Sequence, residues 1–348
     1  MSKNRKLKVL DLFSGCGGLS FGFGMQNFEI VAGIDNWQEA LITFEKNHKG
    51  AKGILVDLSN AAAVKNLIKN IGHIDVIVGG PPCQGFSISG KRNPNDPRNT
   101  LYKNFVELLK ELKPAAFLME NVPNLVAMDK GKIKNKIIKD FSNMGYKVSH
   151  QILLASDYGV PQNRKRVVFV GLKNGKKFIF PTPTHSKKKI TIQEAISDLS
   201  EKTTKDGTPY SIAPRSEYQE RMRKESNGLY NHEETLHTEK TKSIINLVPD
   251  GGNYKDLPEK YKNTRKVNIA WTRFSSKKPS LTIDTGHNHH FHYKYNRVPT
   301  ARESARIQSF PDNFIFMGKK NDQLKQIGNA VPPLLAEAIA KQLLNFLT

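Results

Sequence analysis

Short apolar runs rich in β-branched residues alternate with stretches of helical period through the first half of the chain. This alternation is typical of a parallel sheet whose strands are joined by crossover helices. The predicted strands are residues 8–13, 29–35, 53–57, 74–79, 115–120, 148–154 and 166–172. The sequence therefore predicts an α/β fold with a doubly wound, mostly parallel sheet.

Two of the intervening stretches have a clear helical pattern. In residues 99–112 the apolar side chains fall on one face, and the pattern ends before Pro114. In residues 133–144 an apolar stripe recurs at the same period and stops at Gly145. Both segments are long enough to connect one parallel strand to the next.

The alternation is lost after residue 172. Two prolines and a lysine run at 187–189 are typical of a linker, and polar, loop-rich sequence follows as far as residue 295. Helical pattern returns at residues 300–308 and 333–346, and the last segment could pack on the sheet. A length of 348 residues fits roughly two domains, so we expect a second, smaller and irregular domain.

The charge of the chain points to a polyanionic partner. Lys and Arg number 54 against 32 Asp and Glu, a formal net charge of +22, and the loop-rich segment has the higher charge density. On charge alone, a surface of solvated lysines is an equally good interpretation. No apolar run is as long as a membrane span, and the N-terminal apolar stretch is too short for a secretory signal. We expect a cytoplasmic protein with no membrane partner.

A glycine-rich turn follows the first predicted strand. Its sequence, Phe13-Ser14-Gly15-Cys16-Gly17-Gly18, opens into a predicted helix and would let a ligand approach the backbone closely. The third glycine of a dinucleotide fingerprint would fall on Ser20, and no Gly-Lys-Ser/Thr of a phosphate loop follows. By itself this turn is weak support for a nucleotide site.

Two aspartates end the next two predicted strands at the same edge of the sheet. Asp35 lies 20 residues after Gly15, where its carboxylate could bind both hydroxyls of a ribose, and Asp57 lies where an adenine amino group could sit. Taken singly, each is as readily a turn-forming or helix-capping aspartate. Together they favour a nucleoside cofactor that needs no phosphate-binding loop, which suits S-adenosyl-L-methionine better than NAD.

The chain has two cysteines, too few for a disulfide framework or a cysteine-rich zinc site. Cys83 follows the fourth predicted strand, in a loop that two prolines stiffen. Most unpaired cysteines are small buried hydrophobic residues, but this rigid polar loop favours a presented nucleophile. Glu120 ends the fifth strand at the same edge, where its carboxylate could lie beside the thiol; the alternative is a cap before Pro123.

Six blocks of sequence, in order and spacing, resemble the motif set of DNA cytosine-5 methyltransferases of the bacterial restriction-modification type. The resemblance runs from about residue 8 to the C-terminus, and only residues 173–280 lack family-wide motifs. The blocks are residues 11–18 (DLFSGCGG), 81–84 (PPCQ), 120–122 (ENV), 162–166 (QNRKR), 302–311 (RESARIQSFP) and 328–332 (GNAVP).

This resemblance implies a mechanism. Cys83 would add to carbon 6 of a cytosine and turn the ring into an enamine that attacks the methyl group. Glu120 would donate a hydrogen bond or proton at ring nitrogen 3. Arg164 and Arg166 would face the cytosine carbonyl oxygen and help to hold the active-site loop. The target base would flip out of the duplex, the loop of residues 86–99 would close over it, and a base that the sequence does not identify would remove the carbon 5 proton.

The resemblance also implies two sets of binding residues. Those expected to bind S-adenosyl-L-methionine are Phe13, Ser14, Gly15, Gly17, Gly18, Asp35, Asp57, Leu58, Pro82, Leu101, Asn329 and Val331. Those expected to bind DNA are Gln84, Ser87, Lys91, Arg92, Arg273 and Arg297. The sequence does not separate arginines that read bases from arginines that bind phosphates.

The domains and partners follow from the same resemblance. A Rossmann-like, S-adenosylmethionine-dependent methyltransferase domain of residues 1–185 and 322–348 would enclose a target-recognition domain of residues 186–321. The histidine cluster at 287–292 has no cysteine nearby and no regular helical pair, so we expect no metal. We expect a monomer acting on double-stranded DNA at the bacterial nucleoid, with any cognate restriction endonuclease acting separately.

Two alternatives remain. One is a non-catalytic DNA-binding relative, against which the intact Cys83, Glu120 and Arg166 argue. The other is an enzyme that keeps the chemistry but methylates RNA. The long variable segment between the blocks at 162–166 and 302–311 favours duplex DNA over RNA.

Overall fold

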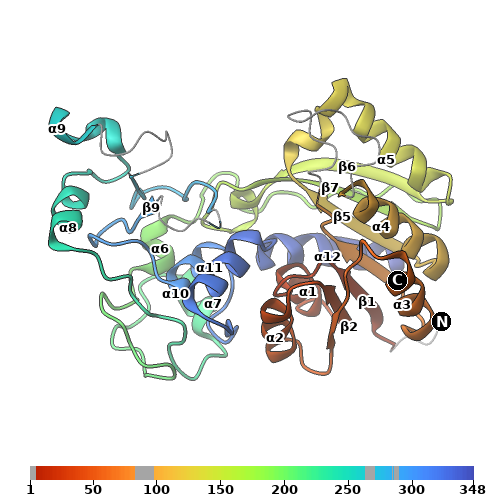
Figure 1. The fold of residues 1–348 in the computed structure, drawn as a ribbon, viewed down its shortest axis with the longest axis horizontal. Coiled ribbons are helices and arrows are strands. Elements are labelled where there is room, and N and C mark those ends of the chain that lie inside the picture. The colour runs from red at the N-terminus through yellow and green to blue at the C-terminus, as the bar shows by residue number, and fades with distance from the viewer. Residues whose placement is uncertain (1–4, 83–97, 263–270, 284, 286–289) are drawn as a thin grey trace. The chain divides into compact units, whose positions relative to one another are not determined.

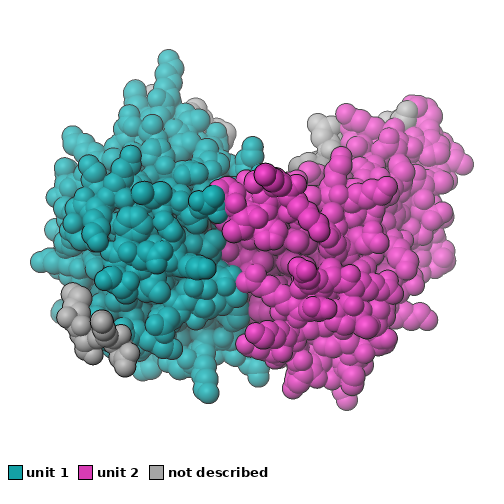
Figure 2. Space-filling model, turned by 180° about the vertical axis from the view of Figure 1, so that it is seen from behind, with its two compact units in different colours: residues 1–154, 165–182, 335–348 teal, residues 155–164, 183–334 magenta. Residues whose placement is uncertain are grey.

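The computed structural model describes residues 5–82, 98–262, 271–283, 285 and 290–348. The chain divides into two compact units (Figure 2). Unit 1 comprises residues 1–154, 165–182 and 335–348, and unit 2 comprises residues 155–164 and 183–334. These limits differ from the expected domain boundaries, because residues 155–164, 183–185 and 322–334 group with unit 2. The functions expected of the two domains stay predictions.

Unit 1 is built on a seven-stranded sheet (Figure 1). In order across the sheet, the strands are β3 (Lys52–Leu55), β2 (Phe28–Asp35), β1 (Leu7–Leu12), β4 (Val76–Gly79), β5 (Ala116–Asn121), β7 (Lys165–Leu172) and β6 (Lys147–Leu154). The first five strands of the chain pair in parallel, and β7 is antiparallel to both β5 and β6. All seven predicted strands are present, and the mostly parallel sheet is confirmed.

Side chains on both faces of this sheet are buried. Ile77 of β4 and Phe117 of β5 belong to a large apolar cluster that also includes side chains of α3, α4 and α5. Their neighbours Val76, Val78 and Leu118 point to the opposite face and are also buried. Burial on both faces explains why these strands are continuous apolar runs rather than alternating ones. It is the doubly wound arrangement that the sequence predicts.

The helices of unit 1 connect and cover the strands. They are α1 (Gly18–Gly24), α2 (Gln38–Asn47), α3 (Ala61–Asn70), α4 (Arg98–Leu112), α5 (Lys132–Ser142) and most of α12 (Pro333–Leu347), with the 3-10 turns η2 (Pro123–Val126) and η3 (Met128–Gly131). The predicted helices at 99–112 and 133–144 correspond to α4 and α5. The C-terminal helix returns to the N-terminal part of the unit, where Gln26 donates a hydrogen bond to Glu337 of α12 at 3.0 Å. No helix in the described part of the chain is both long and apolar enough to cross a membrane.

Unit 2 consists of short elements joined by long loops (Figure 1). Its elements are η4 (Ala155–Tyr158), α6 (Ile192–Ile196), α7 (Glu217–Arg223), α8 (Glu239–Asn246), η5 (Tyr254–Asp256), α9 (Glu259–Lys262), β8 (Thr272–Arg273), β9 (His290–Phe291), α10 (Ala301–Ile307) and α11 (Lys320–Asn329). The two short strands pair in parallel. The expected helix at 300–308 corresponds to α10, which a capping box of Thr300 and Glu303 starts.

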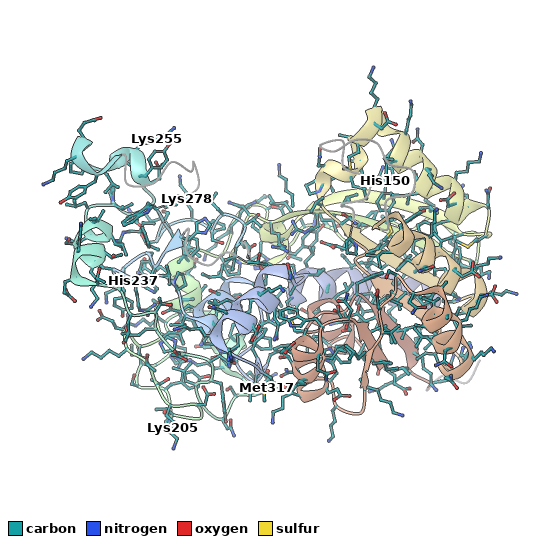
Figure 3. All side chains as sticks on the ribbon, in the orientation of Figure 1. His150, Lys205, His237, Lys255, Lys278 and Met317 are labelled. Carbon is teal, nitrogen blue, oxygen red and sulfur yellow. The ribbon has the colours of Figure 1, made fainter. Side chains whose placement is uncertain are left out.

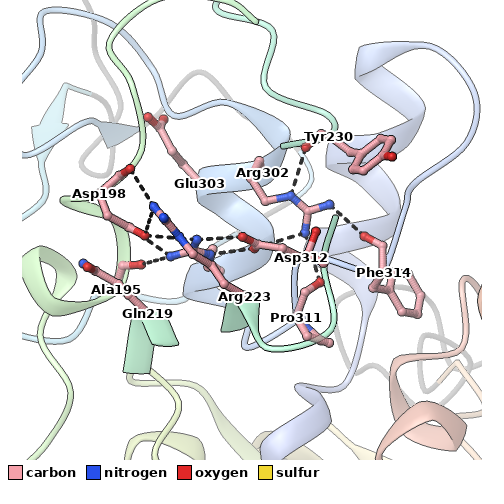
Figure 4. A network of polar contacts seen from close by, with 12 residues as sticks. Ala195, Asp198, Gln219, Arg223, Tyr230, Arg302, Glu303, Pro311, Asp312 and Phe314 are labelled. Carbon is pink, nitrogen blue, oxygen red and sulfur yellow. Dashed lines mark hydrogen bonds and ion pairs between the residues drawn. The ribbon is translucent and has the colours of Figure 1, made fainter. Parts of the chain in front are cut away.

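The core of unit 2 contains a network of buried charged side chains (Figure 4). Arg306 of α10 donates to the two carboxylate oxygens of Asp312 at 2.6 and 2.7 Å, and to Asp198 at 3.0 Å. Burial opposes ionisation of Asp312, but the charge of Arg306 outweighs it and holds the pKa of that carboxyl below its usual value. One turn earlier, Arg302 donates to three backbone carbonyls, those of Tyr230, Pro311 and Phe314. The network therefore fixes loops that have no regular secondary structure of their own.

Surface lysines of unit 2 have the opposite environment. Lys205, Lys255 and Lys278 are exposed; Lys205 and Lys278 lie on loops and Lys255 in η5, and Figure 3 labels all three. In this unit the arginines of the network stabilise the interior, whereas such lysines contribute positive charge to the surface.

Replacing Arg306 with Met is expected to lower the free energy of unfolding by about 3–5 kcal/mol, because Asp198 and Asp312 would each lose one of their two cationic partners in the buried network. Urea denaturation followed by circular dichroism measures the change. The matched control is Arg215→Met, an exposed arginine of the same unit, for which we expect a change below about 0.5 kcal/mol. Equal stabilities of the two variants would show that the network does not hold the unit together.

Candidate active site

The turn between β1 and α1 has a backbone that requires glycine at one position. Phe13, Gly15 and Gly17 have positive φ angles of 59, 52 and 90°. A Cβ atom on Gly17 would lie 2.3 Å from the ring of His48 and 2.6 Å from that of Phe44, so any side chain there would clash. A Cβ on Gly15 would meet no described atom within 4 Å. The backbone at Gly15 is therefore open to a ligand.

Asp35, the last residue of β2, connects this turn to the neighbouring strand. The amide of Gly15 donates to Oδ2 of Asp35 at 2.8 Å, and the amide of Trp37 donates to Oδ1 at 3.0 Å. Burial raises the pKa of Asp35 above its usual value, although these amides favour the ionised form. The structure thus brings together the glycine turn and the aspartate expected at the ribose.

The residues expected around the adenine lie beyond the next strand and on α4. β3 ends at Leu55, earlier than predicted, so Asp57 sits in the turn before α3 and accepts a hydrogen bond from the amide of Ser59 at 2.8 Å. Three apolar residues of the predicted set belong to one cluster, namely Phe13, Leu58 and Leu101. Three more lie close in sequence to the strand ends: Ser14 in the turn, Gly18 at the start of α1, and Pro82, which is exposed, after β4. Their contacts with a cofactor stay predictions.

Glu120 and Arg166 form an ion pair across two antiparallel strands. Glu120 of β5 is in register with Val168 of β7, and Arg166 lies two residues away on the same strand. Nε of Arg166 is 2.7 Å from Oε1 of Glu120, and their side chains are only 14% and 12% exposed. The two residues that the resemblance places at the cytosine ring are therefore in direct contact and largely shielded from water.

The segment that leads into Cys83 passes beside Glu120. A Cβ on Gly80 would lie 3.1 Å from Oε2 of Glu120. The side-chain amide of Asn121, which follows Glu120, donates to the carbonyl of Pro81 at 2.8 Å. The carboxyl end of β5 thus holds the start of the loop that carries Cys83. Cys83 itself lies outside the described residues, as do Gln84, Ser87, Lys91, Arg92 and most of the loop at 86–99.

Three motif blocks that are far apart in sequence meet in unit 2. The guanidinium group of Arg164, which is buried, donates to the carbonyl of Gly328 at 3.0 Å. Gln162 donates to the side chain of Gln308, which donates in turn to the carbonyl of Ala330 at 2.6 Å. These contacts hold the segment of Asn329 and Val331, of which Asn329 is exposed and Val331 half-buried. In this structure Arg164 donates to backbone carbonyls and supports the segment at Gly328. Its expected contacts with cytosine and with the active-site loop stay predictions.

The structure does not support DNA contacts for Arg273 and Arg297. Both side chains are buried. Arg273 donates to the carbonyls of Val248 and Ile245, each at 2.7 Å, and Arg297 donates to the two carboxylate oxygens of Glu303 at 2.8 and 2.7 Å. Their donors are directed into the interior of unit 2, so we correct the expectation: these arginines stabilise the unit.

The histidine cluster is described only in part. Residues 287–289 lie outside the described residues, whereas His290 and His292 are buried. Nδ1 of His292 accepts hydrogen bonds from the amides of Lys294 and Tyr295, each at 3.0 Å, so this ring fixes a turn. Among the described residues there is no group of three His, Cys, Asp or Glu side chains that could hold a metal.

Cys16, the other cysteine of the chain, is poorly suited to nucleophilic chemistry. It is 1% exposed within the turn, and burial raises the pKa of its thiol to about 12. Such a thiol stays protonated near neutral pH, and the thiolate is the nucleophilic form.

Four residues that make contacts at these sites are not among those expected from the sequence. Two of them, Gln162 and Gln308, belong to the motif blocks, and that position in the sequence could have identified them. Asn121 follows the catalytic candidate Glu120 directly. His48 lies beyond the end of α2, and no sequence pattern marks it.

The chain matches a protein-family model described as C-5 cytosine-specific DNA methylase over residues 7–345. The type II methyltransferase M.DdeI of Desulfomicrobium norvegicum is 39% identical, over 97% of this chain and 88% of the relative. The type II methyltransferase M1.HphI of Haemophilus parahaemolyticus is 37% identical, over 98% of this chain and 88% of the relative.

Solved structures show the same similarity. A crystal structure described as that of a DNA modification methyltransferase encoded within a prophage (E. coli) matches with a TM-score of 0.76 and 31% identity, over 98% of this chain and 99% of that one. The crystal structure of the S. pombe Dnmt2 methyltransferase matches with a TM-score of 0.63 and 19% identity, over 99% and 100%, and shows a shared fold.

Proposed function

The chain belongs to the family of C-5 cytosine-specific DNA methylases, and we propose that it methylates one cytosine within a short duplex DNA sequence, with S-adenosyl-L-methionine as methyl donor and Cys83 as nucleophile. One observation in unit 1 supports this proposal most strongly. Three adjacent parallel strands, β1, β4 and β5, end at the same edge of the sheet. β1 leads into the glycine turn, and β4 leads into the segment before Cys83. β5 carries Glu120 next to its last residue.

The residues at the carboxyl ends of β1 and β2 suit the proposed cofactor. Gly15 offers an open stretch of backbone, Asp35 offers a carboxylate for a ribose, and Phe13 is a partly buried aromatic side chain that an adenine ring could stack against. When bound there, S-adenosyl-L-methionine supplies a methyl group on a positively charged sulfur. The remaining predicted contacts, from Asp57, Leu58, Leu101, Asn329 and Val331, would complete its pocket.

The protein residues perform the other parts of the chemistry. The Cys83 thiolate would form a bond to carbon 6 of the cytosine as the carbon 5–carbon 6 double bond opens, and the displaced electron pair would make carbon 5 nucleophilic enough to accept a methyl group. Negative charge moves toward ring nitrogen 3, to which Glu120 in its protonated form donates a hydrogen bond. Arg166 holds the carboxyl group of Glu120 in place at 2.7 Å and supplies positive charge beside the ring. Loss of the carbon 5 proton then lets the thiolate leave.

The substrate would reach these residues by base flipping. A cytosine stacked in duplex DNA cannot contact a nucleophile beside a sheet edge, so the target nucleotide would rotate out of the helix into the site. The net charge of +22 would favour docking on the phosphate backbone. Gln84, Ser87, Lys91 and Arg92 would contact the DNA around the flipped base.

The biological setting follows from the relatives. M.DdeI and M1.HphI are named type II methyltransferases. We infer that this enzyme acts as a monomer on chromosomal DNA at the nucleoid and protects it from a cognate restriction endonuclease that acts separately.

Purified protein is expected to transfer labelled methyl groups from S-adenosyl-L-methionine to duplex DNA, with 5-methylcytosine as the modified nucleoside. Incubation with genomic DNA or with total RNA, followed by nucleoside mass spectrometry, measures the product in each polymer. The matched control is DNA from a host already modified by the same enzyme, which should accept no further label. Label in RNA only would overturn the DNA assignment, and N4-methylcytosine or N6-methyladenine would overturn the carbon 5 chemistry.

A further inference from the structure

Behind the glycine turn of unit 1 lies a buried histidine to which the proposed mechanism gives no role. His48 follows the last residue of α2 and is 5% exposed. Its ring stacks on that of Phe44, with centroids 4.1 Å apart, and meets the edge of Phe21 at 5.8 Å. An apolar side chain would fill such a position without desolvating two ring nitrogens. The histidine therefore needs an explanation beyond packing.

The glycine turn packs directly against the ring of His48, at Gly17. A Cβ on Gly17 would lie 2.3 Å from Cε1 and 3.0 Å from Nε2 of this ring. Gly17 itself has a φ of 90°, a conformation that few other residues adopt. Close contact with the ring on one side thus determines where the backbone of the turn can run.

Hydrogen bonds fix the orientation of the ring. Nδ1 of His48 is 2.8 Å from the carbonyl of Phe44, and because a carbonyl can only accept, Nδ1 carries the proton. Burial lowers the pKa of His48 to about 4, so the ring is neutral near pH 7 and Nε2 is an acceptor. The hydroxyl of Ser20 lies 3.2 Å from Nε2 and also 3.2 Å from the carbonyl of Gly17, and it can donate its single proton to either acceptor. Ser20 on α1 is therefore within hydrogen-bonding distance of both the ring and the turn.

Helix α2, which His48 follows, is linked to the turn at its other end as well. The amide of Trp37, at the start of α2, donates to Asp35, whose other oxygen receives the amide of Gly15. His48, just beyond the end of α2, contacts Gly17. The two ends of one helix thus hold two glycines that lie two residues apart.

We propose that His48, together with Ser20, is a positioning residue that sets the backbone of the glycine turn in the shape that binds the cofactor. This inference rests on the proposed function, in which the turn receives S-adenosyl-L-methionine. His48 touches no reacting atom, and its effect would appear in cofactor affinity because a preorganised turn loses less conformational freedom on binding. DNA affinity and the rate at saturating cofactor would be unchanged.

The test is titration calorimetry of the full chain with S-adenosylhomocysteine, the demethylated cofactor. His48→Ala is expected to raise Kd about tenfold, and His48→Phe, which keeps a ring under Gly17, is expected to recover most of that loss. Ser20→Ala, a milder change, is expected to raise Kd about threefold. The matched control is His150→Phe, a more exposed histidine on β6 that stacks on Phe169, whose Kd should equal that of the wild type.

A purely structural role would give another pattern. It would lower the melting temperature of the His48 and Ser20 variants and leave Kd and the cofactor KM of the folded protein unchanged, and that result would overturn the inference. Should His48→Ala fail to fold, an unchanged Kd in Ser20→Ala would overturn it equally. Absence of binding by the wild type would instead overturn the proposed function, and this inference with it.

Discussion

The Cys83→Ser variant is expected to transfer no measurable methyl group to DNA, a loss of at least about 1,000-fold in kcat, while it binds S-adenosyl-L-methionine as the wild type does. A serine hydroxyl is not ionised near neutral pH and is a far weaker nucleophile toward carbon 6 than a thiolate. In the proposed function the cofactor binds at the ends of other strands, through the turn at Gly15 and through Asp35, which are hydrogen-bonded to each other. Radiolabel transfer and calorimetry measure the two properties separately.

The second cysteine provides the matched control for this experiment. Cys16 is buried in the turn, where a hydroxyl of similar size can replace the protonated thiol. We expect Cys16→Ser to keep kcat within about threefold of the wild type. If Cys83→Ser were as active as Cys16→Ser, the covalent step could not use Cys83.

The Glu120→Gln variant is expected to lose about 100- to 10,000-fold in kcat, the usual contribution of a positioned acid or base. The amide keeps the size of the side chain, and its oxygen can still accept from Arg166, which lies 2.7 Å from the carboxylate in the wild type. It has no proton to transfer to ring nitrogen 3 and lacks the carboxyl group that Arg166 orients. Single-turnover methyl transfer at saturating cofactor and DNA measures the effect on the chemical step.

Two further measurements make the Glu120 result specific. Glu111→Gln, an exposed glutamate on α4, should leave the rate unchanged. Cofactor affinity should be unchanged in both variants, because Glu120 lies in β5 whereas the glycine turn follows β1. Wild-type single-turnover rates in Glu120→Gln would remove this carboxyl group from the mechanism.

The sheet and the order of the site residues along it could be predicted from sequence. Parallel strands buried on both faces must be continuously apolar, and such runs stand out between helical segments. Once the strands are placed, chain order puts the glycine turn, Asp35 and Glu120 at the carboxyl edge. The exact ends were harder: β3 stops at Leu55, and Asp57 falls in the following turn.

The interior of unit 2 could not be predicted, for a physical reason. Arg297, Arg302, Arg306 and Asp312 have the composition of a surface, yet all four are buried. The arginines form ion pairs and donate hydrogen bonds to backbone carbonyls, and Asp312 accepts from Arg306. Hydrophobic periodicity carries no information about such a core, because its stability comes from pairing across long sequence separations. For the same reason Arg273 and Arg297 looked like DNA contacts.

Contacts between distant segments were also beyond sequence reasoning. Gln162 and Gln308 are 146 residues apart, and His48 meets Gly17 only because α2 folds back behind the turn. The motif blocks indicated which segments must assemble. The structure shows, within each unit, which side chains hold them together.

Sequencing of cytosine methylation in DNA from cells that express the protein, beside cells that express Cys83→Ser, tests the central claim most directly. We expect that cytosines at one position of one short recurring sequence become 5-methylcytosine with the wild-type protein, and that the same positions stay unmodified with Cys83→Ser. Absence of site-specific 5-methylcytosine with the wild-type protein, or an identical methylation pattern with Cys83→Ser, would contradict it.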